Sequence, residues 1–309
     1  MDISLRQLEV FVSTVENRSF SKAADALYLS QSTVSSHIAQ LETLLKAPLL
    51  ERKDKRSAEP TPAGWRVYKS AKEILNLCRN MQDEFSLDES NRQFICIAAS
   101  TVPSRYLVPQ LISAYVAKYP GAKFSVLEGD SAYALEKLKT GEAALAFVGT
   151  KYRTRSFHYH TLCRDRIVLI TPNTGEFLTK QKEGVFGREL LSYPMILREA
   201  GSGTRKETDK YLAHIGVGPE NLSIIAHMND MESIKKAVIS GLGTTIISER
   251  VAEDAIAAGK VLRFQLDAED FYRNLYLAYA KNRHFAAEER NFIAFAQKHL
   301  DADGHFIRG

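Results

Sequence analysis

Apolar residues recur at helical spacing in two short segments of the stretch Ser19–Glu42, and a polar turn separates the segments. In the second segment, steps of four, three and four place the apolar side chains on one helix face: Val34, Ile38, Leu41 and Leu45. Ser19 and Ser30 stand where the two helices would begin, and serine is a preferred N-cap residue. The pattern therefore predicts two helices joined by a tight turn at Tyr28 and Leu29.

The opposite face of the second helix consists of small side chains without Lys or Glu, unlike an ordinary solvated face: Ser32, Ser35, Ser36 and Ala39. Such a face can approach another surface closely, and its hydroxyl groups can bond to phosphates or base edges. Ala23 and Ala24 in the first helix allow the two helices to cross at short range, as a helix-turn-helix requires. For this stretch alone, an ordinary helical hairpin with a neutral surface remains the alternative.

The flanking segments favour a DNA-binding unit. Ser4–Val15 has one apolar face and predicts a third helix, and the basic run 52–56 stands where a wing would meet phosphates. A basic run is usually only a solvated loop, but this one follows a helix-turn-helix. The predicted DNA contacts come from the start of the second helix and from the basic run: Ser30, Gln31, Ser32, Thr33, Ser35, Ser36, Arg52, Lys53, Lys55 and Arg56.

In this order and spacing, the segment resembles the N-terminal winged helix of the LysR-type transcriptional regulators. The matching positions run from Leu5 to Gly64: Leu8, Phe11, Ser19, Ala23, Ala24, Ser30, Gln31, Ser32, Thr33, Val34, Ser35, Ile38, Leu41, Glu42, Pro48, Leu49, Glu51, Arg52, Thr61, Pro62, Ala63 and Gly64. Three positions depart from the family pattern: Ser36 replaces a common basic residue, Lys46 a frequent Gly and Leu50 a frequent Phe. The resemblance implies a DNA-binding regulator, and the departures concern which bases it contacts.

From Thr61 onward a long helix is predicted, with Pro62 at a permitted first-turn position. Apolar residues then recur at steps of 4, 3, 4, 3 and 4, which is the seam of two helices packed side by side: Val67, Ala71, Ile74, Cys78, Met81 and Phe85. Packing against the chain's own C-terminal part is one explanation. A homodimer is the preferred one, because a helix-turn-helix that reads a two-fold site needs a second copy. In the resembling family the equivalent linker helix dimerises.

Beyond the polar stretch 86–91, short apolar runs alternate with amphipathic segments, which predicts an α/β fold with parallel sheets covered by helices. The predicted strands are Phe94–Ala99, Phe124–Leu127, Ala144–Val148, Ile167–Ile170, Met195–Leu197, Leu222–Ala226, Thr244–Ile247, Val261–Phe264 and Leu275–Ala280. The predicted helices are Pro103–Tyr119, Ser131–Lys139, Gly203–Ile215, Met231–Ser240, Glu249–Ala258 and Phe285–Leu300.

A run of this length is expected to split into two lobes with a cleft between them. The resemblance implies the same, because the family's C-terminal domain is similar to periplasmic solute-binding proteins. The predicted domains are a winged helix-turn-helix over 1–60, a linker and dimerisation helix over 61–90, and an effector-binding domain over 91–309. Within the last, lobe I comprises 91–162 and 266–309, and lobe II comprises 163–265.

The composition of the chain serves mainly to exclude other classes of protein. The 309 residues, 45% hydrophobic and 25% charged, are typical of a globular protein, and the net charge is only +4. Residues 1–60 hold eight basic and eight acidic side chains, so bulk charge does not indicate nucleic-acid binding. The start of the chain does not read as a signal peptide, and no apolar run approaches the roughly 18 residues of a membrane span. Cys78, Cys96 and Cys163 lack metal-ligand spacing and are expected to be free thiols, which predicts a cytoplasmic location.

Three places lie beyond strand ends, where ligands of open α/β folds bind. Ser100 and Thr101 follow the first strand, and plain helix capping is the alternative explanation for both. Gly149 and Thr150 follow the strand ending at Val148, although a plain turn explains them equally well. The third place is the segment 198–205, which follows a predicted strand and opens a helix. The predicted effector contacts are Ser100, Thr101, Gly149, Thr150, Ser202, Gly203, Thr204 and Arg205.

Two glycines, two hydroxyl groups and an arginine at a helix start, in the order GSGTR, make a nest for an anion. The segment is neither a Walker A loop nor a dinucleotide fingerprint, and a capped helix with a flexible entry loop is its alternative. Within the resembling family, GSGTR is typical of a subset that includes regulators of sulfur assimilation and carbon fixation, whose effectors are small and often anionic. His158 and His160 share a strand face, but they lack a third ligand, so we predict neither a metal nor a cofactor.

The sequence therefore predicts a transcription factor controlled by a small anionic metabolite. Its predicted partners are double-stranded DNA, the effector and further copies of itself, as a homodimer or a dimer of dimers, and no membrane. A solute-binding protein would need a signal peptide and no helix-turn-helix. An enzyme would need a nucleophile elbow, a placed Ser/His/Asp set or a phosphoryl-transfer motif, and the sequence shows none of these.

Overall fold

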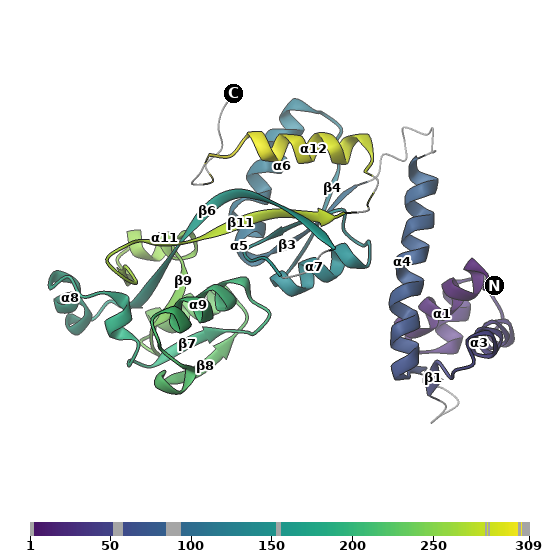
Figure 1. Ribbon diagram of the computed structural model, residues 1–309, viewed down its shortest axis with the longest axis horizontal. Helices are drawn as coiled ribbons and strands as arrows, with labels where there is room; N and C mark the ends of the chain where they lie inside the picture. The colour runs from purple at the N-terminus through teal and green to yellow at the C-terminus, as the bar shows by residue number, and fades with distance from the viewer. Residues whose placement is uncertain are drawn as a thin grey trace. The chain divides into compact units, whose positions relative to one another are not determined.

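The structure is a computed structural model that describes residues 3–51, 58–84, 94–152, 156–281, 283, 285–301 and 304 (Figure 1). Its internal contacts divide the chain into two units. One comprises residues 1–91 with 139–142, and the other comprises 92–138 with 143–309. We call them the N-terminal unit and the effector unit and describe each by itself.

Three helices, a two-stranded sheet and one long helix form the N-terminal unit: α1 (Leu5–Asn17), α2 (Phe20–Ala26), α3 (Gln31–Leu45), β1 (Leu50–Glu51), β2 (Glu59–Pro60) and α4 (Pro62–Glu84). The predicted helix-turn-helix is confirmed in α2 and α3. Ser19 Oγ accepts a hydrogen bond from the Lys22 amide at 3.4 Å, and Ser30 Oγ accepts one from the Thr33 amide at 3.1 Å. Both predicted caps are therefore present.

In the core of this unit, the apolar faces of α1, α2 and α3 pack against one another and against residues next to β1 and β2. Phe11, Val34, Leu41 and Leu49 are fully buried, and Ala23 lies at the contact between α1, α2 and α3. The apolar face predicted for α3 is thus the buried one, and its small-residue face is left exposed.

The apolar seam predicted for α4 divides into two parts. Val67 and Ala71 pack against the core of the N-terminal unit, together with Leu75. Farther along the helix, Ile74 and Met81 are exposed, as is Leu77, which the predicted seam did not include. Phe85, the last predicted seam position, lies outside the described residues.

The effector unit contains a seven-stranded sheet, a separate two-stranded sheet and the helices around them. Its strands are β3 (Ile95–Ser100), β4 (Phe124–Gly129), β5 (Leu145–Val148), β6 (Phe157–Pro172), β7 (Met195–Arg198), β8 (Ile224–Met228), β9 (Thr245–Ser248), β10 (Val261–Phe264) and β11 (Phe271–Ala280). Its helices are α5 (Thr101–Tyr106), α6 (Val108–Lys118), α7 (Ser131–Lys139), α8 (Gly175–Lys182), α9 (Gly203–His214), α10 (Met231–Ile239), α11 (Glu249–Ala257) and α12 (Ala287–Lys298), with 3-10 turns at Gly187–Leu190 and Pro219–Asn221.

Two long antiparallel strands, β6 and β11, join two lobes, which Figure 1 shows at either end of these strands. In lobe I, β11 continues the sheet through β5, β3 and β4. In lobe II, β6 pairs with β9 and β10, and β7 pairs with β8 beside them. The lobes expected from the alternating pattern are thus present, held together by two continuous strands.

The prediction of parallel sheets holds for some of the strand pairs and fails for others. Among the described residues, β3–β4, β3–β5 and β7–β8 are parallel, whereas β6 is antiparallel to β9, β10 and β11, and β5 is antiparallel to β11. The α/β fold class holds, but the strands that pass between the lobes do not follow the local strand–helix alternation. The sequence pattern predicted β6 as two separate pieces, at 158–160 and 167–170, and located only the apolar part of β11. In the structure each strand is continuous from one lobe to the other.

The helix predicted over Pro103–Tyr119 is in fact two helices, α5 and α6, which meet at Leu107. Pro109 lies in the first turn of α6, where its missing N–H is tolerated, but a continuous helix would need that N–H. α5 itself begins at Thr101, directly after β3. Within the described residues, none of the helices is long and apolar enough to cross a membrane.

Candidate functional site

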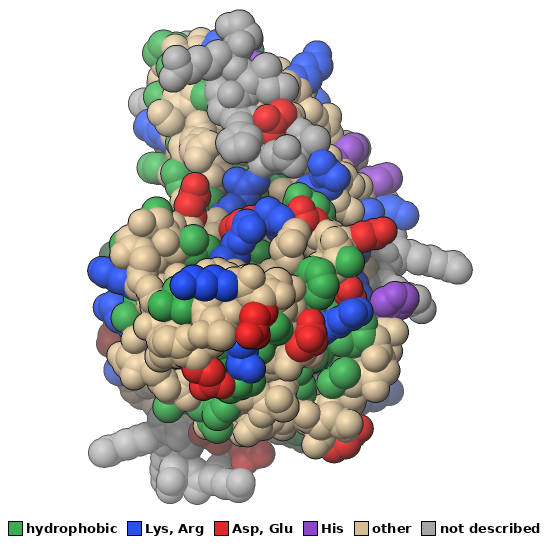
Figure 2. Space-filling model, turned by 90° about the vertical axis from the view of Figure 1, so that its left-hand side faces the viewer, with side chains coloured by type: hydrophobic (Ala, Val, Ile, Leu, Met, Phe, Trp, Pro, Cys, Tyr) green, Lys and Arg blue, Asp and Glu red, His purple; other side chains and the backbone are tan. Residues whose placement is uncertain are grey.

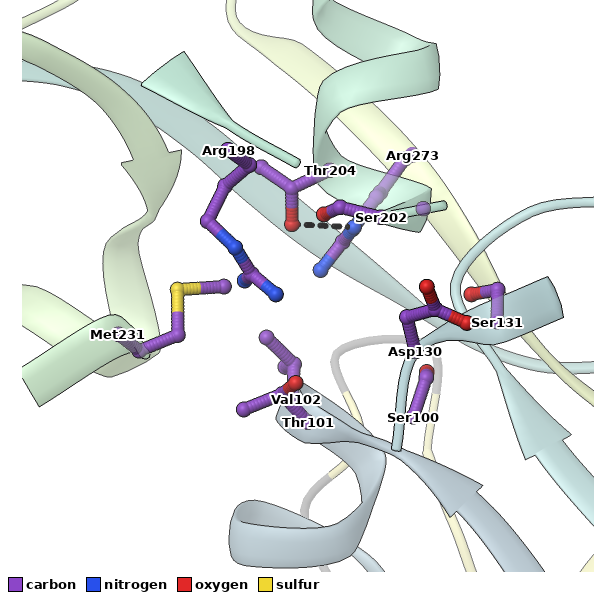
Figure 3. Close-up of a pocket in the computed structure, with 11 residues that line it drawn as sticks. Ser100, Thr101, Val102, Asp130, Ser131, Arg198, Ser202, Thr204, Met231 and Arg273 are labelled. Carbon is purple, nitrogen blue, oxygen red and sulfur yellow. Dashed lines mark hydrogen bonds between the residues drawn. The ribbon is translucent and has the colours of Figure 1, made fainter. Parts of the chain in front are cut away.

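A pocket lies between the lobes of the effector unit, at the ends of several strands (Figure 3). Lobe I contributes the end of β3, the start of α5 and the turn between β4 and α7. Lobe II contributes the end of β7 and the starts of α9 and α10, and β11 contributes one arginine. The lining residues are Ser100, Thr101, Val102, Asp130, Ser131, Arg198, Ser202, Gly203, Thr204, Met231 and Arg273.

The pocket is narrow in this conformation. The space open to a water-sized sphere is about 10 Å³, roughly what a single water molecule needs. The lobes would therefore have to separate to admit a metabolite.

The N-terminus of α9 opens into the pocket. Ser202 caps this helix, and its Oγ accepts a hydrogen bond from the Arg205 amide at 3.3 Å. The other amide groups of the first turn have no partners within the helix, so they and the helix dipole favour a negative charge here.

Arg273 reaches the same place from β11 and is almost fully buried. Its Nε and Nη2 both lie 2.8 Å from Oδ2 of Asp165, and its Nη1 donates to Thr204 Oγ1 at 2.9 Å. Asp165, fully buried on β6, also accepts a hydrogen bond from Ser248 at 2.7 Å. This network holds Arg273 in place, joins β6 to β11 and ties both strands to the start of α9.

A second buried arginine, Arg198, ends β7 and points into the pocket (Figure 3). Its Nε and Nη2 donate to the two carboxylate oxygens of Glu199 at 2.8 and 2.7 Å. Arginine presents a planar fork of donors that suits carboxylates and other oxyanions. Arg198 and Arg273 thus supply the cationic side chains of the pocket.

Asp130 and Ser131 face these groups from lobe I. Asp130 Oδ1 accepts a hydrogen bond from the Tyr133 amide at 2.7 Å, which caps α7. Ser131 Oγ is buried and has no hydrogen-bond partner among the described residues. Tyr152 lies nearby with its hydroxyl 3.5 Å from the carbonyl oxygen of Gly201, and burial together with the charge of Asp130 raises the pKa of Tyr152.

Five of the predicted effector contacts line this pocket: Ser100, Thr101, Ser202, Gly203 and Thr204. The other three do not line it. Gly149 lies against Arg273, Thr150 donates to Glu207 at 2.6 Å, and Arg205 turns away to bond Asp209 at 2.7 Å and the Arg198 carbonyl oxygen at 3.2 Å.

Six lining residues were not among the predicted contacts, although one of them, Arg198, belonged to the predicted segment 198–205: Val102, Asp130, Ser131, Arg198, Met231 and Arg273. The strand-end rule could have found Asp130 and Ser131, which follow a predicted strand just as Ser100 does. Arg198 stood at the end of a predicted strand as well. Arg273 gave no signal, because it lies within β11 and reaches the pocket only through the antiparallel pairing with β6.

The predicted DNA-binding face is the exposed side of α3. Ser30, Gln31, Ser32, Ser35 and Ser36 are exposed, and Thr33 is half-buried. Tyr28, in the turn before α3, is 97% exposed and has a positive φ of 54°. The basic residues Arg52, Lys53, Lys55 and Arg56 lie outside the described residues.

On the side of lobe II that Figure 2 shows, Lys and Arg side chains are interspersed with Asp and Glu. That face therefore has no continuous basic surface that would compete with α3 for nucleic acid. A metal site at His158 and His160 also finds no support: His160 Nε2 pairs with the Tyr279 hydroxyl at 2.8 Å. No group of three His, Cys, Asp or Glu side chains suited to a metal ion occurs among the described residues.

Two family models match the chain, one in its C-terminal part and one in its N-terminal part. Residues 88–301 match the family model described as "LysR substrate binding domain", and residues 5–65 match "Bacterial regulatory helix-turn-helix protein, lysR family". An uncharacterized HTH-type transcriptional regulator of Methanocaldococcus jannaschii is 29% identical over 96% of this chain and 100% of its own length. The transcriptional activator CmpR of Synechocystis sp. is 26% identical over 97% of this chain and 96% of its own.

Among solved structures, full-length CbnR complexed with its target DNA has a TM-score of 0.67 at 18% identity and covers 96% of this chain and 99% of its own. A full-length OxyR variant from Pseudomonas aeruginosa has a TM-score of 0.66 at 19% identity, over 96% of each chain. The effector binding domain of QuiR in complex with shikimate has a TM-score of 0.60 at 18% identity, over 67% of this chain and 96% of its own. These three show the same fold.

Proposed function

The chain belongs to the LysR family of DNA-binding transcriptional regulators, and from this premise we propose that a small anionic metabolite bound between its two lobes controls its action on DNA. The chain is a regulator and not an enzyme. We also propose that it works in the cytoplasm as a homodimer or homotetramer, through α4 and through further contacts of the effector unit.

One observation supports the ligand proposal above all others. Two buried arginines, Arg198 and Arg273, reach the pocket into which the N-terminus of α9 opens. Donors and dipoles that converge in a desolvated pocket are suited to an oxyanion such as a carboxylate, sulfate or phosphate group. QuiR, which shares the fold, holds shikimate in its effector domain.

A ligand bound in this pocket would act by changing how closely the two lobes approach each other. Because the lining comes from both lobes, a ligand there stabilises the arrangement in which they are close. β6 and β11 are the strands that pass between the lobes, and the Asp165–Arg273 pair joins them at the pocket. A ligand that favours one lobe arrangement shifts the population of the whole effector unit, and by linkage the placement of the DNA-binding units.

The ligand proposal is tested by a thermal-shift screen of the full chain with small anions and amino-acid derivatives. A compound that binds raises the melting temperature according to mass action. Replacing Arg198 with Gln should weaken that binding at least tenfold. Arg198 is preferable to Arg273 for this test, because loss of Arg273 would deprive the fully buried Asp165 of its nearest cation and so destabilise the fold itself.

Arg188 provides the matched control, since it is a half-exposed lobe II arginine that pairs with Asp267 outside the pocket. Arg188→Gln should leave ligand binding unchanged. If Arg198→Gln and Arg188→Gln behave alike toward every compound that binds, the pocket is not the effector site.

The DNA proposal is tested with Ser35, which is exposed on the small-residue face of α3. Ser35→Glu places a negative charge where a phosphate or base edge would lie, and it should reduce affinity for the chain's own upstream DNA at least tenfold in a filter-binding assay. Thr43→Glu, two turns farther along α3, is the control and should change the affinity by less than about threefold, because contacts to bases come mainly from the N-terminal residues of a recognition helix. Equal loss in both variants would count against α3 as the DNA-reading helix.

A further inference from the structure

Asp130 gives the pocket a negative charge that an ordinary anion site lacks. Figure 3 shows Asp130 and Ser131 on the side of the pocket opposite Arg198. One carboxylate oxygen of Asp130 caps α7, and the other lies against Gly201, where an added Cβ would be only 1.8 Å away. The carboxylate therefore lies beside the loop that opens α9.

The carboxylates around the pocket differ in whether they have a cationic partner. Arg198 is paired with Glu199, and Arg273 is paired with Asp165. Within the part of the chain that the structure describes, Asp130 has no Lys, Arg or His within 4.0 Å. Asp165 is shared with Arg250, whose Nε lies 3.5 Å from its Oδ1, so Arg273 is only partly compensated, whereas Asp130 is a carboxylate without a cationic partner among the described residues.

Ser131 adds an independent sign that a ligand group belongs here. Its Oγ is fully buried, lines the pocket and lacks a hydrogen-bond partner among the described residues. Buried hydroxyl groups in native proteins are almost always paired, so an unpaired one beside a pocket points to a partner that arrives with the ligand. Asp130 and Ser131 are adjacent, and together they offer acceptors to a single donor group.

We propose that the effector is a small zwitterion of the amino-acid class. Its anionic group binds Arg198, Arg273 and the N-terminus of α9, and its protonated amine binds the Asp130 carboxylate and the Ser131 hydroxyl. This inference rests on the proposed ligand site, and it replaces a simple anion with a molecule that carries both charges.

The decisive variant is Asp130→Asn, because the amide oxygen can still accept the Tyr133 N–H while the charge is removed. The full chain and this variant are titrated calorimetrically with the standard amino acids, with the matching 2-hydroxy acids and with sodium sulfate at constant ionic strength. We expect an amino acid to bind the unmodified chain at least tenfold more tightly than its 2-hydroxy counterpart or sulfate. Asp130→Asn should bind that amino acid at least tenfold more weakly and sulfate at least tenfold more tightly.

Glu136→Gln removes the same charge from α7 outside the pocket and should change neither affinity. The proposal is overturned if the unmodified chain binds sulfate or a 2-hydroxy acid as tightly as any amino acid, or if Asp130→Asn does not strengthen sulfate binding. Arg198→Gln separates the two ideas. If simple anions bind the chain and Arg198→Gln weakens them while Asp130→Asn has no effect, the site stands and the zwitterion fails. If Arg198→Gln has no effect on any ligand, the site itself fails.

Discussion

Lys46 ends α3 in a conformation that lysine rarely adopts. It is the C-cap residue, with φ 53° and ψ 36°, and its amide donates to the carbonyl groups of Glu42 and Thr43. The left-handed region crowds the Cβ of every residue except glycine, at about 1 kcal/mol for a single position. Lys46 is one of the positions that depart from the family pattern, and the usual Gly has a conformational reason there.

Lys46→Gly should therefore stabilise the N-terminal unit by about 0.5–1 kcal/mol. The only tryptophan of the chain, Trp65, lies on α4, so its fluorescence during urea unfolding reports on this unit. Lys46→Ala keeps the Cβ and serves as the control, with no gain in stability. An equal gain from both substitutions would show that the lysine side chain, and not the backbone conformation, is unfavourable.

Individual residues of the pocket differ in how well the sequence identified them. Ser202 and Thr204 were found because a cap and a glycine-flanked turn are local signals, encoded within a few residues. Arg205 was chosen with them as the cation, but its place on α9 lets it bond Asp209 one turn later. Arg273 also supplies a charge to the pocket, but it lies 69 residues beyond its partner Thr204 in the sequence. A pattern within a few residues cannot reveal such a contact.

Among the elements, the loop that opens α9 depends on glycine for close packing between the lobes. An added Cβ on Gly203 would lie 2.6 Å from Ser131 Oγ and 3.3 Å from the backbone carbon of Gly149, both in lobe I. The backbone of Gly149 cannot yield as a flexible side chain can. Gly203 therefore sets how closely the two lobes approach at the pocket.

Gly203→Ala should hold the lobes apart and lower ligand affinity at least tenfold in calorimetry. The control is Gly175→Ala at the start of α8, where an added Cβ meets nothing within 4 Å. Thermal unfolding without ligand should show both variants folded. Unchanged affinity in Gly203→Ala would mean that the lobes need not approach this closely to bind.

The second half of α4 exposes a row of large apolar side chains, Ile74, Leu77 and Met81, of which Leu77 is 66% exposed. Leu77→Lys should shift the chain toward the monomer in sedimentation velocity at micromolar concentration, because burying a lysine in a helix–helix seam is strongly unfavourable. Leu44→Lys makes the same change at an exposed leucine of α3 and should leave the oligomer intact. If neither variant becomes monomeric, self-association does not depend on this row of side chains.

Element by element, the sequence pattern was most reliable for short helices and strands that lie within one lobe. α7 and β10 begin and end at the predicted residues. The pattern failed where a strand serves both lobes: β6 was predicted as two separate pieces, at 158–160 and 167–170, although one strand spans 16 residues. α8 was missed, because of its residues only Phe177 is buried and the rest give little periodic signal.

For the effector unit as a whole, closure also depends on Arg105, which bridges carboxylates of both lobes. Its guanidinium lies 3.4 Å from Glu128 in lobe I and 3.4 Å from Asp230 in lobe II, with Glu232 at 4.0 Å. Val102, one turn earlier on α5, and Met231, between the two lobe II carboxylates, both line the pocket. The four charged residues do not line the pocket themselves, so these pairs form at its edge.

Arg105→Gln should shift the unit toward the open arrangement and weaken ligand binding about threefold, since partly exposed ion pairs contribute roughly 0.2–1 kcal/mol each. Calorimetry at 50 and 500 mM salt checks the cause: high salt should weaken binding to the unmodified chain more than to Arg105→Gln, because screening acts on the pairs that the variant lacks. Linkage requires that a ligand which alters DNA affinity through closure also loses part of that effect in the variant. If Arg105→Gln binds ligand normally yet responds less to it on DNA, the bridge transmits closure to the DNA-binding units without stabilising it.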